Sequence, residues 1–289
     1  MKRRDLLKLL GVAAGTAACP RDAAAEEPSG AVGTSDPVGV LVDTTRCIGC
    51  RACEFACAAA NGLPEPAADV APSPERETST TQWTVVKGYQ VGDRAITVKR
   101  QCMHCLQPAC TSACLTKAMY KTPDGPVTWR SSKCMGCRYC MVSCPFDVPK
   151  FEYHSAVPRI QKCQLCSARV AAGEQPACVA ACPAGALTFG RRNNLLDEAR
   201  SRIYAQPGSY VHQIYGEHEA GGTSWLYLSA VPFEQVGFRT DIGTTAFPTY
   251  TKEFLYAVPL VLTVVPPFLL GLRRAIGGTD QDGDEGGDA

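Results

Sequence analysis

Short apolar segments alternate with turn-rich loops along most of this 289-residue chain, and the loops contain closely spaced cysteines. Each cysteine group ends in a C-x3-C step, which places two thiols at i and i+4 and predicts a short helix there. Six apolar or alternating segments predict short β-strands: residues 38–42, 94–100, 126–130 and 158–162 before cysteine groups, and residues 118–122 and 186–190 after them. The unit of strand, cysteine loop, helix and strand repeats, so the pattern predicts an α+β fold.

Residues 62–92 separate the first cysteine group from the second and are rich in Pro, Thr and Glu. We expect an inserted surface loop with one short strand, near the aromatic stretch at residues 83–89. Trp83 and Tyr89 have two alternative uses, packing over a metal site or docking a partner, and packing is favoured.

The cysteines stop after Arg192, and the pattern changes. Residues 194–204 predict a helix whose one face carries Leu195, Leu196, Ala199 and Ile203, and residues 223–231 predict a strand. Neither segment carries obvious chemistry. We therefore expect residues 193–250 to form an arm that packs on the cysteine-rich domain, residues 38–192, or on a partner subunit.

Residues 254–272 contain no charged side chain. A helix of this length rises about 30 Å and can cross a bilayer. Three prolines within it weaken the helix, and a buried core helix is the alternative. Arg273 and Arg274 place this end in the cytoplasm. The acidic, glycine-rich residues 273–289 predict a disordered cytoplasmic tail.

The first 25 residues resemble an export signal. Residues 2–8 read Lys-Arg-Arg-Asp-Leu-Leu-Lys, and an apolar run and the small residues 23–25 follow, as in a twin-arginine leader. That pathway exports folded proteins, so metal centres inserted in the cytoplasm can reach the periplasm. The alternative is a basic amphipathic helix. Cys19 lies inside this leader and is interpreted as incidental, with acylation as the alternative.

Sixteen of the 17 cysteines fall into four groups of four. The first and third follow the C-x2-C-x2-C-x3-C pattern, and the other two lengthen one gap but keep the final x3 step. This pattern is typical of [4Fe-4S] ligands, in which the fourth thiolate binds a neighbouring cluster. The groups are Cys47, Cys50, Cys53, Cys57; Cys102, Cys105, Cys110, Cys114; Cys134, Cys137, Cys140, Cys144; and Cys163, Cys166, Cys178, Cys182.

Zinc sites and disulfides are the alternatives to clusters. Structural zinc uses two cysteine pairs and does not require a helical C-x3-C ending. Repeated C-x2-C pairs form a poor disulfide framework because the short loops strain each bridge. Four [4Fe-4S] clusters are therefore favoured, and a chain that holds four clusters transfers electrons.

A basic residue precedes each cysteine group: Arg46, Arg100, Lys133 and Lys162. A cation near a cluster favours its reduced state, and the alternative is an ordinary solvated strand end. His104 lies inside the second group, where its N–H can donate to sulfur. We do not expect His104 to be a ligand because every group already supplies four thiolates.

The charge balance excludes a nucleic-acid footprint. The leader holds five of the 29 basic residues and two of the 28 acidic residues, which leaves the rest of the chain slightly negative. A nucleic-acid-binding domain would need a basic excess.

Four segments resemble the four-cluster, ferredoxin-type subunits of membrane-bound respiratory oxidoreductases. They are Cys-Met-His-Cys at residues 102–105, Cys-Arg-Tyr-Cys-Met-Val-Ser-Cys-Pro at 137–145, Cys-Pro-Ala-Gly-Ala at 182–186 and Gly-Gly-Thr-Ser-Trp-Leu-Tyr-Leu-Ser at 221–229. The leader and the single C-terminal anchor are similar to those of the electron-transfer subunit of periplasmic [NiFe] hydrogenases of the hydrogenase 2 type.

The resemblance implies two pseudo-symmetric bacterial-ferredoxin-like units with insertions, the inner one at about residues 94–153, plus a C-terminal transmembrane helix. It also implies that the groups exchange their last cysteines, the first with the fourth and the second with the third. The expected ligand sets are Cys47, Cys50, Cys53 with Cys182; Cys163, Cys166, Cys178 with Cys57; Cys102, Cys105, Cys110 with Cys144; and Cys134, Cys137, Cys140 with Cys114.

Two positions depart from the ferredoxin pattern. Ala58 and Leu115 stand where proline would follow the fourth cysteine, which puts the local turn in doubt. No group lacks a cysteine, so nothing in the sequence predicts a [3Fe-4S] cluster.

The resemblance implies an electron-transfer subunit with no catalytic residues of its own. We expect it on the periplasmic side of the inner membrane, between the small and large subunits of a [NiFe] hydrogenase and a polytopic quinone-reactive membrane subunit. The alternative is the equivalent subunit of a molybdenum or tungsten enzyme that acts on formate, sulfoxides or sulfur compounds. A zinc-containing periplasmic binding protein is the alternative from a different class.

Overall fold

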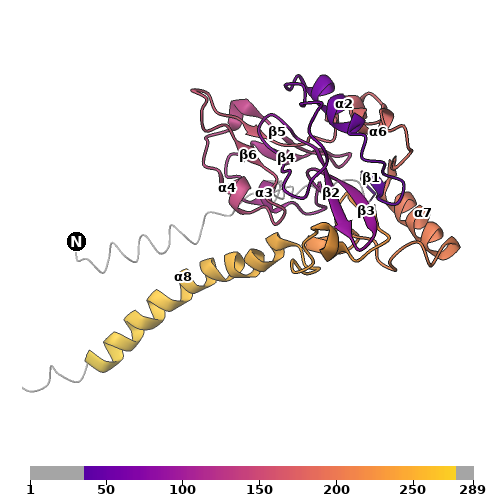
Figure 1. The fold of residues 1–289 in the computed structure, drawn as a ribbon. Coiled ribbons are helices and arrows are strands. Elements are labelled where there is room, and N and C mark those ends of the chain that lie inside the picture. The colour runs from indigo at the N-terminus through magenta and orange to yellow at the C-terminus, as the bar shows by residue number, and fades with distance from the viewer. Residues whose placement is uncertain (1–35, 278–289) are drawn as a thin grey trace, which may run out of the picture. The chain divides into compact units, whose positions relative to one another are not determined.

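The computed structural model describes residues 36–277 as a mixed α+β fold (Figure 1). The expected leader with Cys19 and residues 278–289 of the expected tail lie outside this range. A three-stranded sheet has the order β8-β1-β9, formed by β8 (Leu187–Arg191), β1 (Val38–Asp43) and β9 (Trp225–Leu228). β1 pairs antiparallel with β8 and parallel with β9, so strands from three distant parts of the chain meet here.

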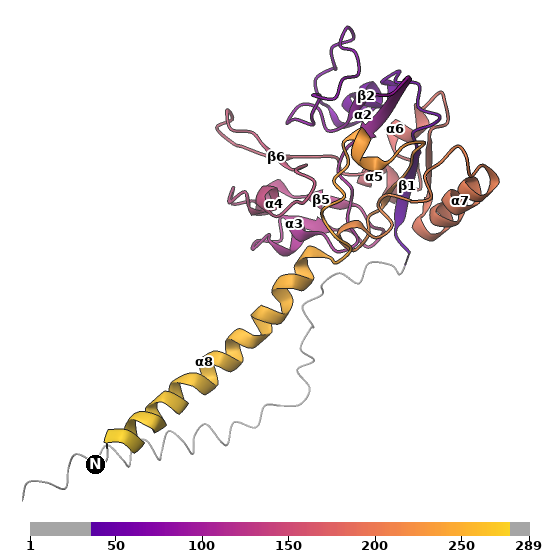
Figure 2. The ribbon, with the colours of Figure 1, turned by 60° about the horizontal axis from the view of Figure 1, so that its bottom comes forward.

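Side chains alternate between the two faces of this sheet. Leu41, Leu226 and Leu228 pack on α7 (Arg192–Ala205), which follows β8 directly. All four apolar positions expected on the buried face of that helix are buried: Leu195, Leu196, Ala199 and Ile203. α7 therefore covers one face of the sheet (Figure 2), because its apolar stripe matches the leucines that point toward it.

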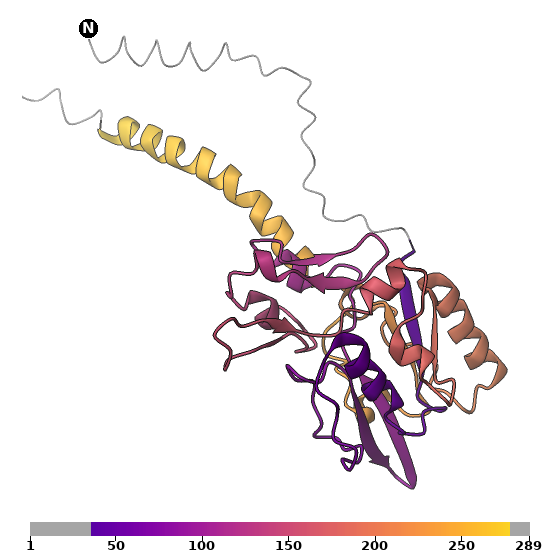
Figure 3. The same ribbon diagram turned by 90° about the horizontal axis from the view of Figure 1, so that it is seen from above.

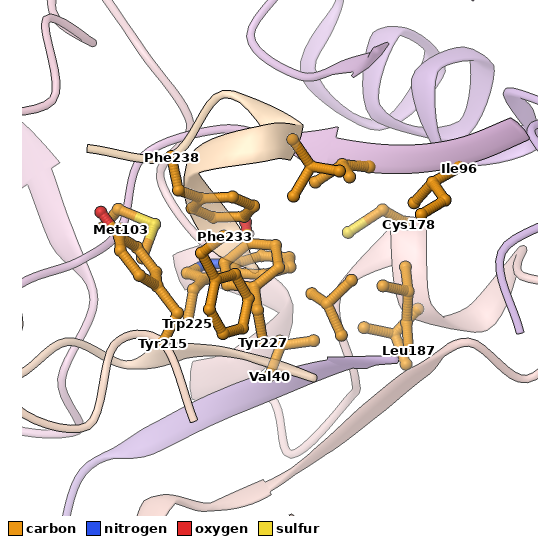
Figure 4. Close-up of a cluster of buried hydrophobic side chains, with 14 of the residues drawn as sticks. Val40, Ile96, Met103, Cys178, Leu187, Tyr215, Trp225, Tyr227, Phe233 and Phe238 are labelled. Carbon is orange, nitrogen blue, oxygen red and sulfur yellow. The ribbon is translucent and has the colours of Figure 1, made fainter. Parts of the chain in front are cut away.

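The opposite face carries an aromatic cluster (Figure 4). Trp225 and Tyr227 project from β9, and Phe233 comes from η3 (Phe233–Val236). The Tyr215 and Phe238 ring centroids are 4.5 Å apart, as in an attractive tilted pair. Met103 and Cys178 of the cysteine-rich domain belong to the same cluster. The expected arm is thus part of the core, and the sheet and the cysteine loops share one apolar centre.

Three hairpins complete the cysteine-rich region. β2 (Val85–Val91) pairs with β3 (Arg94–Arg100), β4 (Met119–Lys121) with β5 (Val127–Trp129), and β6 (Lys150–Phe151) with β7 (Ile160–Gln161). Short helices lie between and after the hairpins: α3 (Ala109–Ser112), η1 (Ser131–Lys133), α4 (Tyr139–Val142), α5 (Ser167–Ala171), α6 (Ala177–Ala180) and, in the arm, η2 (Glu219–Gly221). The predicted strands are confirmed in position, although those near residues 120, 128, 160 and 226 are shorter than expected.

The inserted segment is held to α2 (Ala52–Asn61) by one buried carboxylate. Glu54 accepts hydrogen bonds from Arg51 at 3.0 Å, from both Arg76 nitrogens at 2.6 and 2.8 Å, from Gln82 at 2.9 Å and from the Val86 amide at 2.5 Å. The seven-residue β2 is longer than the expected short strand because it pairs with β3 over its full length.

The C-terminal apolar segment forms one continuous helix, α8 (Phe247–Gly277), shown in Figure 3. Its best 18-residue window has a mean hydropathy of 2.1, and its side chains are exposed. α8 extends beyond the expected span at both ends, and its last turns include Arg273 and Arg274. Pro259, Pro266 and Pro267 lie within the helix, and Thr263 Oγ1 donates to the Pro259 carbonyl at 2.9 Å.

Candidate iron-sulfur sites

The four cysteine loops share a backbone conformation that sequence reasoning did not anticipate. The residue before the second cysteine of each group has a positive φ: 70° at Gly49, 48° at His104, 74° at Gly136 and 52° at Leu165. A left-handed residue is unfavourable for side chains other than glycine, so its recurrence at His104 and Leu165 marks a loop shape that all four groups need. The glycines of the first and third groups are the visible sequence signal.

Three groups also share the turn that follows the fourth cysteine. The amides of Lys117, Asp147 and Gly185 donate to the carbonyls of Cys114, Cys144 and Cys182 at 3.1–3.3 Å, and these three residues have φ values of 49–60°. Leu115 therefore keeps the turn that prolines 145 and 183 make elsewhere. After Cys57 the turn is absent because α2 continues through Ala58 to Asn61.

The expected helical placement of the last two cysteines holds only for the first group. Cys53 and Cys57 both lie in α2, whereas α3, α4 and α6 end two residues before Cys114, Cys144 and Cys182. The prediction of one helical face in all four groups was therefore wrong. In the last three groups the helix ends before the fourth cysteine, and the turn with the left-handed residue follows.

Two pockets each collect four cysteines. The Cys47 site consists of Cys47, Cys50, Cys53 and Cys182, which line one pocket with Ile48 and Lys99. The Cys163 site consists of Cys163, Cys166, Cys178 and Cys57, which line the other with Trp83 and Trp225. In both sites the fourth cysteine comes from the partner group at the other end of the cysteine-rich region.

The remaining eight cysteines gather in two further sets. At the Cys102 site, burial raises the pKa of the Cys105 thiol, and the charges of Cys144, Cys102 and Cys110 raise it further. At the Cys134 site, burial raises the pKa of Cys140 to about 11, with contributions from Cys114, Cys134 and Cys137. These mutual effects place Cys144 with the second group and Cys114 with the third.

Neighbouring sites also touch. Besides burial, the charge of Cys178 in the Cys163 site helps to raise the pKa of Cys53 in the Cys47 site. Cys163 and Cys102 share one apolar cluster, and Cys110 and Cys140 share another. The four sites therefore form a series in the order Cys47, Cys163, Cys102 and Cys134 site. Cys50 in the first and Cys137 in the last are the two exposed cysteines among the sixteen described.

The donor set fits iron-sulfur clusters. Burial raises the pKa of both Cys53 and Cys57 to about 12, so these thiols need a strong cation to become thiolates at neutral pH. Trp83 and Trp225 line the Cys163 pocket, and within residues 36–277 their Nε1 atoms are buried without a hydrogen-bond partner. Cluster sulfur is an acceptor that such N–H groups can use.

Within the described range, no three His, Cys, Asp or Glu side chains are close enough to bind one metal ion. Ligands of a cubane cluster bind four different iron atoms and are spaced more widely than the ligands of a single zinc ion. The sixteen cysteines of this range are free thiols.

The cations near the sites differ from the expected set. Arg46 is half exposed and Lys133 is exposed, whereas Arg100 stacks 4.2 Å from the Phe238 ring centroid. Lys162 is buried and donates to the carbonyls of Val127 and Cys163. Sequence reasoning missed Lys99, whose burial would lower its pKa, although the charges of Cys178, Cys53 and Cys163 raise it overall.

His104 is fully buried beside the Cys102 site. Its Nδ1 accepts a hydrogen bond from the Val127 amide at 2.8 Å, so the neutral ring carries its proton on Nε2. Burial lowers the pKa of His104 well below its usual value, and the positive charges of Lys162 and Lys121 lower it further. Among residues 36–277, Nε2 has no hydrogen-bond partner and remains available as a donor.

Comparisons with known proteins point to one group of relatives. Residues 94–192 match the 4Fe-4S dicluster domain family. The chain is 49% identical over 280 residues to a protein of Nitratidesulfovibrio vulgaris, covering 94% of this chain and 76% of that protein. It is 34% identical over 331 aligned positions to the hydrogenase-2 operon protein HybA of Escherichia coli, covering 100% and 99%. The iron-sulfur subunit of the nitrate-inducible formate dehydrogenase of Escherichia coli is 34% identical over 201 residues, covering 66% and 67%.

Proposed function

Because this chain belongs to the family of 4Fe-4S dicluster iron-sulfur subunits that includes HybA, we propose that it relays electrons between a periplasmic [NiFe] hydrogenase and a quinone-reactive membrane subunit. The chain is an iron-sulfur electron-transfer subunit related to HybA and to formate dehydrogenase subunits. Sixteen of its 17 cysteines, in four groups with C-x2-C patterns, are compatible with four [4Fe-4S] clusters. A bound [4Fe-4S] cluster accepts and releases one electron at a time.

We infer that each site supplies the four ligands of one cluster. The exchange of the fourth cysteines between groups supports this assignment, because it joins the first group to the fourth and the second to the third. The inner unit, at about residues 94–153, would contain the Cys102 and Cys134 sites. The repeated left-handed loop residue supports two pseudo-symmetric ferredoxin-like units within residues 38–192.

Electrons would pass through the sites in their spatial order. The middle sites contain the most buried cysteines, whereas Cys50 and Cys137 are exposed at the two ends of the series. Ile48 beside Cys50 and Met135 beside Cys137 are 69% and 63% exposed, so both end sites present apolar surface to partners. The single observation that carries the proposal is this series of four thiol sets, open at both ends.

Membrane attachment fits the same role. The apolar helix α8 indicates anchoring, and we propose that it crosses the inner membrane with the cluster domain on the periplasmic side. Export by the twin-arginine pathway through residues 1–25, and a cytoplasmic tail beyond the helix, belong to this proposal. The helix observed over residues 247–277 replaces the narrower expected span.

Hydrogenase small and large subunits are the proposed catalytic partners. The full-length similarity to HybA supports them, because it includes the arm and the anchor as well as the cysteine-rich domain. The alternative partner is a molybdenum or tungsten enzyme, which the similarity to formate dehydrogenase subunits over two thirds of the chain favours.

The test is anaerobic purification of the native protein in detergent, through a tag placed away from the leader, with metal analysis of the same sample. We expect about sixteen iron and sixteen sulfide per chain, with a nickel-containing partner and H2-dependent quinone reduction. Molybdenum or tungsten in the co-purified partner would move the assignment to the alternative. Zinc without iron would overturn electron transfer.

A further inference from the structure

Lys99 lies between two candidate cluster sites and borders both of them. It is the second-to-last residue of β3, just before Arg100, and is buried. The pockets of the Cys47 and Cys163 sites have one lining residue in common, and that residue is Lys99. Electrostatic interactions with Cys53 on one side and with Cys178 and Cys163 on the other agree with this position.

The charge of Lys99 has no carboxylate counterion. Within residues 36–277, no Asp or Glu oxygen lies within ion-pair distance of its ammonium group. Its Nζ donates to Gln101 Oε1 at 2.8 Å and lies 4.4 Å from the Trp225 ring centroid. A buried ammonium ion is costly unless negative charge compensates it. With clusters bound to their thiolates, the two cysteine sites would be the negative groups that face it.

Strand β9 of the arm holds this lysine in place. Gln101 Nε2 donates to the Tyr227 hydroxyl at 2.6 Å, and that hydroxyl donates to the Lys99 carbonyl at 3.0 Å. Trp225 supplies the ring beneath the ammonium group, and both aromatic residues project from the same face of β9 (Figure 4). The lysine therefore has a defined position instead of the freedom of a surface side chain.

The other cations near cysteines do not share this arrangement. At Cys110 of the Cys102 site, burial raises the pKa and the charge of Lys162 partly offsets that rise. The ammonium group of Lys162 donates hydrogen bonds to backbone carbonyls. Arg46 is half exposed and pairs with Asp43 at 3.4 Å, and Lys133 is exposed, so a carboxylate or water screens their charge.

We propose that Lys99 is a buried positive charge, shared by two sites, that raises the reduction potentials of the clusters at both the Cys47 and the Cys163 site. Reduction adds one negative charge to a cluster, and a fixed buried cation stabilises that charge more strongly than an exposed one. Because the ammonium group borders both sites, one residue raises the reduction potentials of the first two clusters of the series together. This inference rests on the proposed function, since it requires clusters at both sites.

The experiment is an EPR-monitored redox titration of the full-length protein in its detergent-solubilised complex, with Lys99→Met compared to the parent protein. We expect the midpoint potentials of two clusters to fall and those of the other two to change little. Signals lost in Cys47→Ser and Cys163→Ser variants identify the two affected clusters. Lys99→Arg keeps the charge, so its midpoint potentials should stay close to those of the parent protein.

Matched controls separate the charge effect from a structural one. Lys133→Met removes an exposed lysine beside Cys134 and should leave all four potentials unchanged. Lys162→Met should lower the midpoint potential of the cluster at the Cys102 site but not that of the cluster at the Cys47 site. If Lys99→Met fails to assemble, Lys99→Gln removes the charge but keeps a hydrogen-bonding group, and it carries the same expectation.

Two results would overturn the inference: unchanged potentials in a neutral Lys99 variant that retains four clusters, or equal shifts at all four. Neither result would affect the proposed function, because the clusters would still be present. Absence of [4Fe-4S] signals from the parent protein would instead contradict the proposed function itself.

Discussion

Individual cysteines decide which group completes which cluster, and Cys57 provides the sharpest test. It lies in the first group but lines the Cys163 pocket. We expect Cys57→Ser to remove the same EPR signal as Cys163→Ser, and a different signal from Cys47→Ser. Iron content should fall by roughly four atoms per chain, the content of one cubane. Loss of the Cys47 signal in Cys57→Ser would instead mean that each group binds its own cluster.

The buried carboxylate of Glu54 is the second residue whose role can be tested. We expect Glu54→Ala to lower the free energy of unfolding by about 3 kcal/mol, because it leaves Arg51 and Arg76 without their shared buried counterion. A denaturant titration, monitored by the loss of cluster absorbance, measures the change in the free energy of unfolding. Glu77→Ala is the control: Glu77 pairs with Lys87 in the same segment, but its side chain is 71% exposed. Equal effects of both substitutions would refute the anchoring role.

At the scale of elements, the close approach of β1 to the segment that enters β9 depends on a missing side chain. A Cβ at Gly39 would lie 2.3 Å from the Ser224 carbonyl oxygen, which accepts the Val40 amide. Gly39→Ala should therefore destabilise the protein by about 2 kcal/mol, since the strands must separate. Thermal unfolding of the purified protein measures this change.

Gly190 provides the matched control, because it pairs directly with Gly39 in the sheet. A Cβ at Gly190 would meet only Leu195 side-chain atoms, at 3.6 Å or more, which is ordinary contact. Gly190→Ala should leave the melting temperature nearly unchanged. A similar loss at both positions would show that the contact with Ser224 is not the cause.

At the scale of the whole molecule, we expect the apolar helix α8 to be separable from the cysteine-rich domain. Removal of residues 247–289 should release the protein into the soluble fraction with its iron content intact, because the sixteen cysteines of the four sites and the residues that line the two pockets all precede Phe247. Removal of residues 278–289 alone should leave it in the membrane. Fractionation with an alkaline wash distinguishes the two results, and retention of the shorter protein after that wash would contradict an anchor in α8.

Local features were the most predictable from sequence. The strands that flank the cysteines, the apolar face of α7 and the long apolar helix all follow from periodicity within one segment. The helical placement of Cys114, Cys144 and Cys182 was wrong because a left-handed turn three residues later ends each helix early. Neither Lys117 nor Asp147 announces such a turn as glycine would.

The sequence by itself determined the chemistry of this protein, because thiol number and spacing are local and limit which cofactor a loop can surround. The spatial series of the four sites, the entry of β9 into the sheet beside β1 and the burial of Lys99 between two pockets were decided only by the tertiary structure. Each of these depends on contacts between residues far apart in the chain. A lysine before a cysteine loop has the same local pattern whether water or two cluster sites surround it, and only the packing of distant strands determines which.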